Sequence, residues 1–341
     1  MDWEQKSIRL GAAVICCAIL LRLLGGGVGQ RLLQAITSPK AVSVLLFLET
    51  GRVVRQPPST SVPTEAATQP PETQPAQQTV PPTVATQPVE TQPPDLSLPV
   101  FSGADAALVK VNSACGYDAQ VATRLTEALK WDLTAAAPTV LILHSHATES
   151  YTGSEGYRSI DVSQNMVSIG DRLVQVLEAG GVRAVHDRQL HDSPSYSNAY
   201  NNSRRSIESY LSQYPTIELV LDLHRDAAEA EDGTQMGFTP EGSDMAQLML
   251  VVGTDASGLS HPRWPENMSL AVKLHAQLER LSPGICRPIS LRSQRFNQDL
   301  SSGALIVEVG AAGNTQQEAL LAVELLGQAI LDLARGAEGE S

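Results

Sequence analysis

Residues 140–151 read Val-Leu-Ile-Leu-His-Ser-His-Ala-Thr-Glu-Ser-Tyr. The first four are large and apolar, and such a short run bounded by polar residues predicts a buried strand. The strand runs directly into two histidines and a glutamate. Two later segments repeat the pattern, because 217–223 is apolar and precedes His224, and 304–307 is apolar and precedes Glu308. Three predicted strands therefore end in residues that bind metal ions or move protons.

Apolar strands alternate with amphipathic helices from residue 99 onward. Strands are predicted at 107–111, 140–143, 182–185, 217–223, 248–252 and 304–309, and helices at 121–129, 166–177, 199–211, 267–281 and from a cap at Asn314 to 333. This alternation predicts an α/β domain of three layers, in which helices cover both faces of a mostly parallel sheet. In such sheets, sites form at the carboxyl ends of the strands.

The residues at these strand ends have the composition of a catalytic zinc site. His146 and Glu149 form an HxxE pair, and His224 supplies a distal histidine. Two histidines and one glutamate leave the fourth position of a zinc ion open for water. Glu308 is then the predicted general base. His144 is either the first ligand in place of His146 or a residue that orients the ligands.

Other readings of the same residues stay open. The His-Ser-His sequence alone is also compatible with polar packing, and a buried Glu308 could pair with Arg225 or Arg292. Further candidates for contact with the substrate or the ligands are Arg225, Asp226, Arg292 and Asn297. Among the other histidines, His186 is expected at a strand end, His275 on a helix surface, and His191 and His261 in loops. Cys115 and Cys286 could pair only if the fold brings them together.

The N-terminal part of the chain has a different composition. Residues 1–30 contain Lys6 and Arg9 before the apolar run 10–24, which predicts a cytoplasmic tip and a single transmembrane anchor. Residues 31–55 form a juxtamembrane segment. Residues 56–98 repeat Thr-Gln-Pro and Gln-Pro-Pro and contain almost no large apolar side chains. This composition predicts a disordered linker, because it buries too little surface to fold. A proline-rich linker of this length reaches on the order of 100 Å. The folded domain is expected at 99–337, followed by a tail at 338–341.

The charge of the chain excludes one class of partner. The formal net charge is −13, and Lys and Arg form no basic stripe. Binding to nucleic acid needs clustered positive charge opposite the phosphates. We therefore expect no nucleic-acid partner.

Six ordered segments resemble the stage II sporulation protein P family. They are Val140–Tyr151 as quoted, Leu221-Asp-Leu-His-Arg-Asp-Ala227, Val251-Val-Gly-Thr-Asp255, His261-Pro-Arg-Trp264 with Asn267, Arg295-Phe-Asn-Gln-Asp-Leu300, and Leu305-Ile-Val-Glu-Val-Gly310 with Gly313-Asn314. The resemblance covers the chain from about residue 98 to its end. The anchor and linker also fit the family.

The resemblance implies a peptidoglycan hydrolase related to the zinc N-acetylmuramoyl-L-alanine amidases. It implies cleavage of the amide between muramic acid and the stem peptide, and of peptide cross-links, during forespore engulfment. It also implies Zn²⁺ as cofactor, a lytic transglycosylase partner and a membrane scaffold. The domain would lie on the outer face of the cytoplasmic membrane, in the septal intermembrane space.

The ligand set implied by the resemblance has two departures. The first-block histidines, Glu149, His224 and Glu308 match the family's zinc and catalytic positions, although Ser145 stands where threonine is usual. More distant amidases carry a ligand glutamate at the start of the next helix, where this chain has Asn165. Either Glu149 replaces that ligand or the metal has an unusual set.

Two competing functions are defined by different observations. A zinc carboxypeptidase-like peptidase also begins its ligand set with HxxE and uses a glutamate near the C-terminus, but the sequence shows no evident arginine clamp for a substrate carboxylate. A catalytically inactive wall-binding scaffold would lack one of the predicted zinc ligands or the general base Glu308. The sequence retains all of these residues.

Overall fold

The computed structural model describes residues 101–129 and 131–337, with side chains to residue 334. The predicted anchor at 1–30, juxtamembrane segment at 31–55, linker at 56–98 and tail at 338–341 lie outside the described residues. Within the described part, no helix is both long and apolar enough to cross a membrane.

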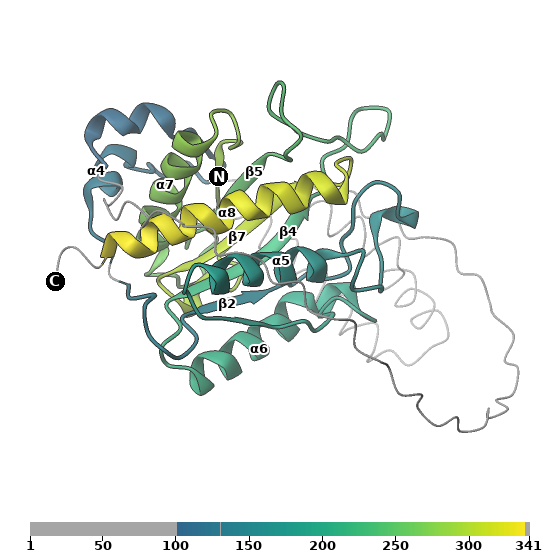
Figure 1. Ribbon diagram of the computed structural model, residues 1–341, viewed down its shortest axis with the longest axis horizontal. Coiled ribbons are helices and arrows are strands. Elements are labelled where there is room, and N and C mark those ends of the chain that lie inside the picture. The colour runs from purple at the N-terminus through teal and green to yellow at the C-terminus, as the bar shows by residue number, and fades with distance from the viewer. Residues whose placement is uncertain (1–100, 130, 338–341) are drawn as a thin grey trace, which may run out of the picture. The chain divides into compact units, whose positions relative to one another are not determined.

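Seven strands form one sheet with the order β1-β6-β5-β7-β4-β2-β3 (Figure 1). Neighbouring strands are parallel except at β5 and β7, which pair antiparallel. Strands β1, β6 and β5 therefore run opposite to the other four. The bounds are β1 Val111–Ser113, β2 Val140–Leu143, β3 Ala184–His186, β4 Leu219–Asp226, β5 Leu248–Gly253, β6 Ile289–Arg292 and β7 Ala304–Ala311.

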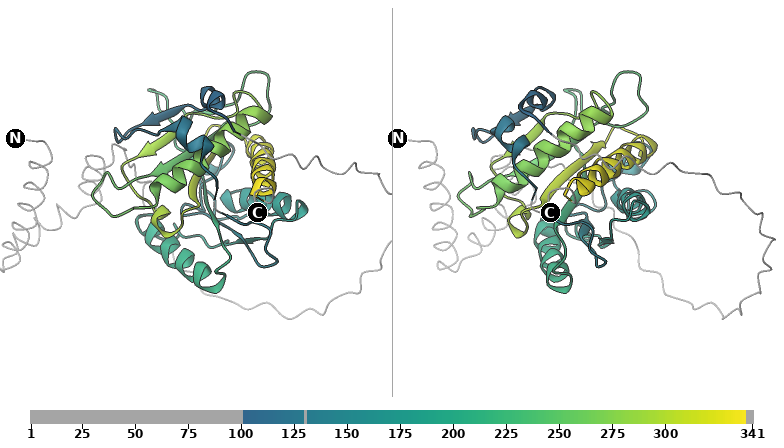
Figure 2. Two further views of the ribbon diagram at one scale, coloured as in Figure 1. Left: turned by 90° about the vertical axis from the view of Figure 1, so that its left-hand side faces the viewer. Right: turned by 60° about the vertical axis from the view of Figure 1, so that its left-hand side comes forward.

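Helices cover both faces of this sheet, as the sequence predicted. Helices α5 (Met166–Ala179), α7 (Trp264–Leu281) and α8 (Gln316–Ala337) share the larger hydrophobic core with one face, and α5 and α8 lie side by side (Figure 1). Helix α6 (Ala199–Gln213) packs on the other face (Figure 2). Leu221 of β4 faces the larger core and Val220 the smaller one, because side chains alternate along a strand.

Most predicted elements are confirmed, with three differences. The expected strand at 107–111 is wrong in its first half, because Gly103–Leu108 forms the 3₁₀ helix η1 and the strand begins at Val111. Helix α4 is shorter than expected and spans Val121–Thr126. Strand β6 was not predicted, because its four residues lie directly after Pro288. Three further 3₁₀ helices are η2 Glu155–Tyr157, η3 Tyr196–Asn198 and η4 Gln298–Leu300.

The start of α8 is fixed by Thr315 rather than by Asn314. The Thr315 hydroxyl accepts the Glu318 N–H, and the Glu318 carboxylate accepts the Thr315 N–H, which is a capping box. The Asn314 side chain instead accepts the N–H groups of Ala311 and Phe238. The expected cap at Asn314 is therefore wrong by one residue.

Strand β7 ends in a bulge that positions Glu308. His224 pairs with Glu308 across β4 and β7, but Asp226 pairs with Ala311, so β7 contains an extra residue. Gly310 there has φ +69°, a left-handed conformation that glycine adopts without strain. A Cβ at Gly310 would also lie 2.8 Å from that of Ala246. The regular pairing of β4 with β7 is therefore interrupted just after Glu308.

Candidate metal centre

Three chain segments meet at one edge of the sheet. The loop after β2 carries His146 and Glu149, β4 carries His224 near its end, and β7 carries Glu308. Because His224 and Glu308 are register partners on neighbouring strands, their side chains leave the same face, with the strands about 4.8 Å apart. This is the face on which α6 packs. The structure thus brings together four residues that the sequence singled out separately.

His146, Glu149 and His224 form a buried cluster that can hold a metal ion. One ligand atom from each lies within 4.8 Å of the others. The Nδ1 atoms of His146 and His224 each lie 3.4 Å from a Glu149 oxygen, Oε1 and Oε2 respectively. Ligands at zinc bond lengths in a tetrahedron are separated by roughly 3.3–3.6 Å, so this spacing fits the ion. Two nitrogens and a carboxylate are also donors that zinc prefers.

Asp222 holds His224 in position from behind. Its Oδ1 lies 2.9 Å from His224 Nε2 and forms an ion pair with the ring when the imidazole is protonated. The same carboxylate accepts the Ser145 N–H at 2.7 Å and the Ser145 hydroxyl at 2.6 Å. A carboxylate behind a histidine fixes the ring and leaves its other nitrogen for a metal. The residue between the two histidines therefore ties β2 to β4 beneath the cluster.

The electrostatic environment of the cluster favours a proton on His224. Burial opposes the charged imidazole, but Asp222 and other neighbours outweigh it and raise the pKa of His224 well above its usual range. Burial likewise opposes ionisation of Glu149, yet His146 and His224 hold the pKa of Glu149 well below its usual range. Glu149 and Asp222 are both buried, and the pKa of each is lowered, which favours two ionised carboxylates. Two such charges in a buried site create a strong preference for a cation.

Arg225 fixes the loop that carries Glu149. Its backbone N–H donates to Glu149 Oε2 at 3.2 Å. Its guanidinium donates to the carbonyls of Ser150 at 2.9 Å and Tyr157 at 2.8 Å. Strand alternation sends this side chain away from His224, so Arg225 contacts the cluster through its backbone and supports the loop through its side chain.

Two tyrosines line the cluster and were not predicted. The Tyr196 ring lies 4.3 Å from the His146 ring, and the Tyr196 hydroxyl is 3.3 Å from His146 Nδ1. The Tyr200 ring lies 5.4 Å from His146 and stacks at 15° on His224, 6.4 Å away. Tyr196 begins the 3₁₀ helix η3, and Tyr200 lies in the first turn of α6.

His144 lies on the other face of the sheet. Its Nδ1 contacts the Leu223 carbonyl at 3.1 Å, and its Nε2 lies 2.8 Å from Nε2 of His186. Gly170 of α5 leaves room for this pair, since a Cβ there would come within 2.5 Å of His186 and 2.7 Å of His144. Of the two histidines in the first block, the structure places only His146 in the cluster.

The remaining candidates lie at different distances from the cluster. Asp226 pairs with Arg287 at 2.8 Å, outside it. Asn297 lies behind it and donates to Ser203, whose hydroxyl contacts that of Ser145. Arg292 is not brought to the site, because β6 runs antiparallel to β4 and its carboxyl end lies at the opposite edge of the sheet.

Several further expectations have an outcome in the structure. His275 was expected on a helix surface and is instead buried in α7. His186 lies at the end of β3 as expected, and His191 and His261 lie in loops but are buried. Asn165 caps α5, accepting the Val167 N–H at 3.0 Å. Cys115 and Cys286, which belong to the described residues, are both free thiols.

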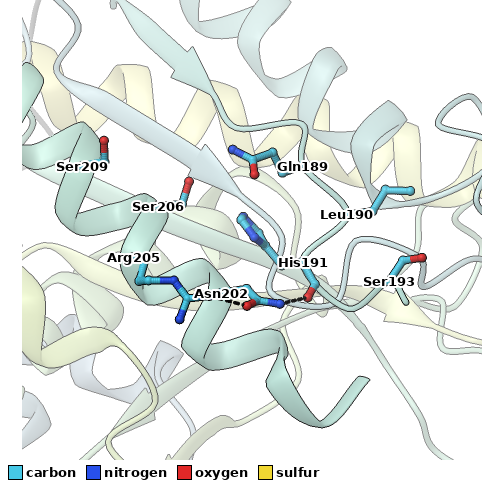
Figure 3. A pocket seen from close by; sticks show the side chains of 8 residues that line it. All are labelled: Gln189, Leu190, His191, Ser193, Asn202, Arg205, Ser206 and Ser209. Atoms are coloured by element: carbon cyan, nitrogen blue, oxygen red, sulfur yellow. Dashed lines mark hydrogen bonds between the residues drawn. The ribbon is translucent and has the colours of Figure 1, made fainter. Parts of the chain in front are cut away.

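A separate polar pocket of about 530 Å³ lies on the other flank of α6 (Figure 3). Side chains of α6 and of the loop after β3 line it, and Asn202 donates to the His191 carbonyl across it at 2.8 Å. Within the described residues, no member of the His146–Glu149–His224 cluster lines this pocket. The chemistry that the sequence predicted is therefore not in this cavity.

These features define the class of protein. An α/β domain with a mostly parallel sheet carries a buried His-Glu-His cluster and a second glutamate, Glu308, near the carboxyl ends of its strands. The chain belongs to the Stage II sporulation protein P (SpoIIP) family, whose model matches residues 54–331. It is 28% identical over 195 residues to Stage II sporulation protein P of Bacillus subtilis (strain 168). That match covers 52% of this chain and about half, 47%, of the relative.

Solved structures of amidases resemble the chain at low identity. An N-acetylmuramoyl-L-alanine amidase from Clostridium difficile 630 is 11% identical with a TM-score of 0.39, covering 61% of this chain and 100% of that one. AmiC2 of Nostoc punctiforme is 16% identical with a TM-score of 0.35, covering 58% and 94%. Both TM-scores are below the level at which likeness alone defines a fold.

Proposed function

We propose that this chain is a zinc-dependent peptidoglycan hydrolase. The proposed reaction is that of an N-acetylmuramoyl-L-alanine amidase with additional endopeptidase activity, which removes stem peptides from cell-wall glycan during forespore engulfment. The observation that carries the proposal is the buried His146–Glu149–His224 cluster beside Glu308. Membership of a sporulation family supports the setting.

In this proposal His146, Glu149 and His224 hold the zinc ion. When bound, zinc supplies a Lewis acid that activates water and polarises the scissile carbonyl. Asp222 keeps the His224 ring in place, and the Arg225 N–H keeps the Glu149 carboxylate in place. Tyr196 and Tyr200 wall one side of the site and reduce its exposure to bulk water.

Glu308 is the proposed general base. It lies on the strand next to His224 and leaves the same face of the sheet. Its carboxylate takes a proton from the attacking water and delivers it to the leaving amine nitrogen, as a positioned carboxylate does in general acid–base catalysis. The bulge after Glu308 interrupts the pairing of β4 with β7, close to the carboxyl ends of both strands.

The proposed location and partners follow from the family and from the N-terminal sequence. The segment at 1–30 anchors the protein in the cytoplasmic membrane with its N-terminus inside, and the linker at 56–98 carries the domain to the wall on the outer side. A lytic transglycosylase that opens the glycan and a membrane scaffold are the proposed partners. A zinc carboxypeptidase-like peptidase is the second candidate function, because its ligand set has the same HxxE pattern.

A chelator experiment tests the proposed function. Purified peptidoglycan is incubated with the protein, and soluble products are separated and weighed by mass spectrometry. We expect intact stem peptides freed from glycan, loss of product with chelator, and recovery with added zinc. Glu308→Gln should lower the rate about 10²- to 10⁴-fold while leaving the zinc content unchanged. Release continuing in chelator would contradict the zinc assignment, and release of single C-terminal residues would favour the carboxypeptidase-like function.

A further inference from the structure

A fixed arginine lies beside the cluster. Arg158 faces Glu149 through an isolated β-bridge, and the flanking Ser150 and Ser159 N–H groups bond to the carbonyls of Tyr157 and Thr148. These contacts attach the segment around Arg158 to the loop that carries Glu149. The backbone of Arg158 is thereby placed as firmly as that of the proposed zinc ligand.

Its side chain is also held in one position. Nη1 donates to the Thr148 hydroxyl at 2.8 Å and to Asp192 Oδ2 at 2.9 Å, and the Asp192 side chain is fully buried. The guanidinium carbon lies 4.6 Å over the Tyr196 ring. Tyr196 in turn packs on His146. The Arg158 guanidinium therefore contacts the Tyr196 ring, which in turn contacts the ring of the proposed ligand His146.

One edge of this guanidinium is available to a ligand. All of its side-chain hydrogen bonds with described residues use Nη1, so Nη2 and Nε make no hydrogen bond within that part of the chain. The side chain is 38% exposed. Two parallel N–H donors on one edge match the two oxygens of a carboxylate. The geometry is that of a carboxylate-binding group at the rim of the site.

The distance to the cluster indicates where that carboxylate lies. The guanidinium carbon is at most about 9 Å from the His146 ring, the length of two to three extended residues. A carboxypeptidase clamp would have to bind the residue directly after the scissile bond. In peptidoglycan, the second residue of the stem peptide is an isoglutamate, whose α-carboxylate is free or amidated. The glycan side of the bond offers no such group next to it.

We propose that Arg158 binds the free carboxylate of the second stem-peptide residue and selects stems in which this group is not amidated. The proposal rests on the proposed peptidoglycan hydrolase function. In this arrangement the stem peptide of the substrate lies against the surface formed by Arg158 and Tyr196. Asp192 and Thr148 position the guanidinium and do not contact the substrate.

The test compares two muropeptides that differ only in that group. We expect the zinc-loaded protein to cleave the carboxylate form with a kcat/KM about 10- to 100-fold above that of the amide form. Arg158→Met should bring the ratio close to one. Arg158→Lys, which keeps the charge but loses the paired donors, should give an intermediate ratio. Arg183→Met, which removes an exposed arginine paired with Glu178 at the other edge of the sheet, should leave the ratio unchanged.

The double variant Arg158→Met with Asp192→Asn removes the buried charge together with its partner and controls for misfolding. A wild-type ratio near one, or a ratio that Arg158→Met and this double variant both leave unchanged, would overturn the assignment of Arg158 while leaving the proposed function intact. If the wild-type protein cleaves neither muropeptide, nor purified peptidoglycan, the proposed function fails and this assignment fails with it.

Discussion

The two histidines of the His-Ser-His sequence lie in opposite environments. His146 faces a glutamate and His224 on the α6 side, with Asp222 behind. His144 faces His186 on the α5 side, beneath Gly170. Burial and neighbouring positive charge lower the pKa of His144 to about 3 and of His186 to about 4. Buried carboxylates favour a cation at the pair His146 and His224, whereas burial and neighbouring positive charge disfavour one at the pair His144 and His186.

This difference shows that the neighbours, rather than the residue type, decide the chemistry. Asp171 contacts His186 Nδ1 at 3.0 Å, so the His144 pair has a carboxylate of its own. That carboxylate is about one-third exposed and also pairs with Arg188, whereas Asp222 is buried and, within the described residues, accepts hydrogen bonds from the neutral N–H and hydroxyl groups of Ser145. A buried carboxylate interacts more strongly with its histidine than one screened by water and an arginine.

The largest predicted effect separates the two histidines directly. His146→Gln removes a proposed zinc ligand, so bound zinc and peptidoglycan cleavage should both be lost. His144→Gln should keep its zinc, because its side chain lies on the other face. It should lower the free energy of unfolding by about 1–3 kcal/mol through the loss of buried hydrogen bonds. Zinc per chain, measured by elemental mass spectrometry, and urea unfolding check both variants. Zinc retained by His146→Gln and lost by His144→Gln would reverse the assignment.

Strand ends, and the residues that follow them, were the part of the site that the sequence could predict. Apolar runs located β2, β4 and β7, and the polar residues after them included all three members of the cluster. The sequence left open which of His144 and His146 binds metal. Side chains alternate between the two faces of the sheet only within a strand, and the predicted strand ends at Leu143. Arg292 was placed wrongly, because apolar composition does not reveal that β5 and β6 run in the opposite direction.

Asp222 and the tyrosines were missed for different reasons. Asp222 interrupts the apolar run 217–223 two residues before His224, and alternation already places both on one face of β4. A carboxylate inside a buried strand was therefore a readable signal. Tyr196 and Tyr200 reach the cluster only because the loop after β3 returns to the edge of the sheet, and this path is a property of the tertiary structure.

A pair of aspartate variants gives the second, smaller effect. Asp222→Asn removes the charge behind His224, and changes of this kind lower metal affinity about 10- to 100-fold. Asp171→Asn makes the same change behind His186 and should leave zinc affinity unchanged. Competition with a zinc-binding dye measures both. Equal affinities of Asp222→Asn and wild type would show that His224 does not need this carboxylate.

The smallest predicted effect is a difference in proton release. A histidine whose pKa is raised by folding carries its proton until the pH exceeds that raised value, so the raised pKa of His224 favours its protonated form in the metal-free protein at pH 7. Zinc binds the neutral imidazole and must displace this proton. His144 and His186, with pKa values of about 3 and about 4, are neutral at pH 7 and contribute none.

Calorimetry at pH 7 in buffers of different ionisation enthalpy counts the protons released. Any proton that a zinc-bound water would lose is common to the compared proteins, so the informative quantity is a difference. Asp222→Asn removes the main positive contribution to the pKa of His224, so the variant should release up to about one proton fewer per zinc than wild type. Asp171→Asn should match wild type. Equal release by all three proteins would show that His224 is already neutral in the metal-free protein. The surrounding carboxylates would then not make His224 differ in charge from His144 and His186.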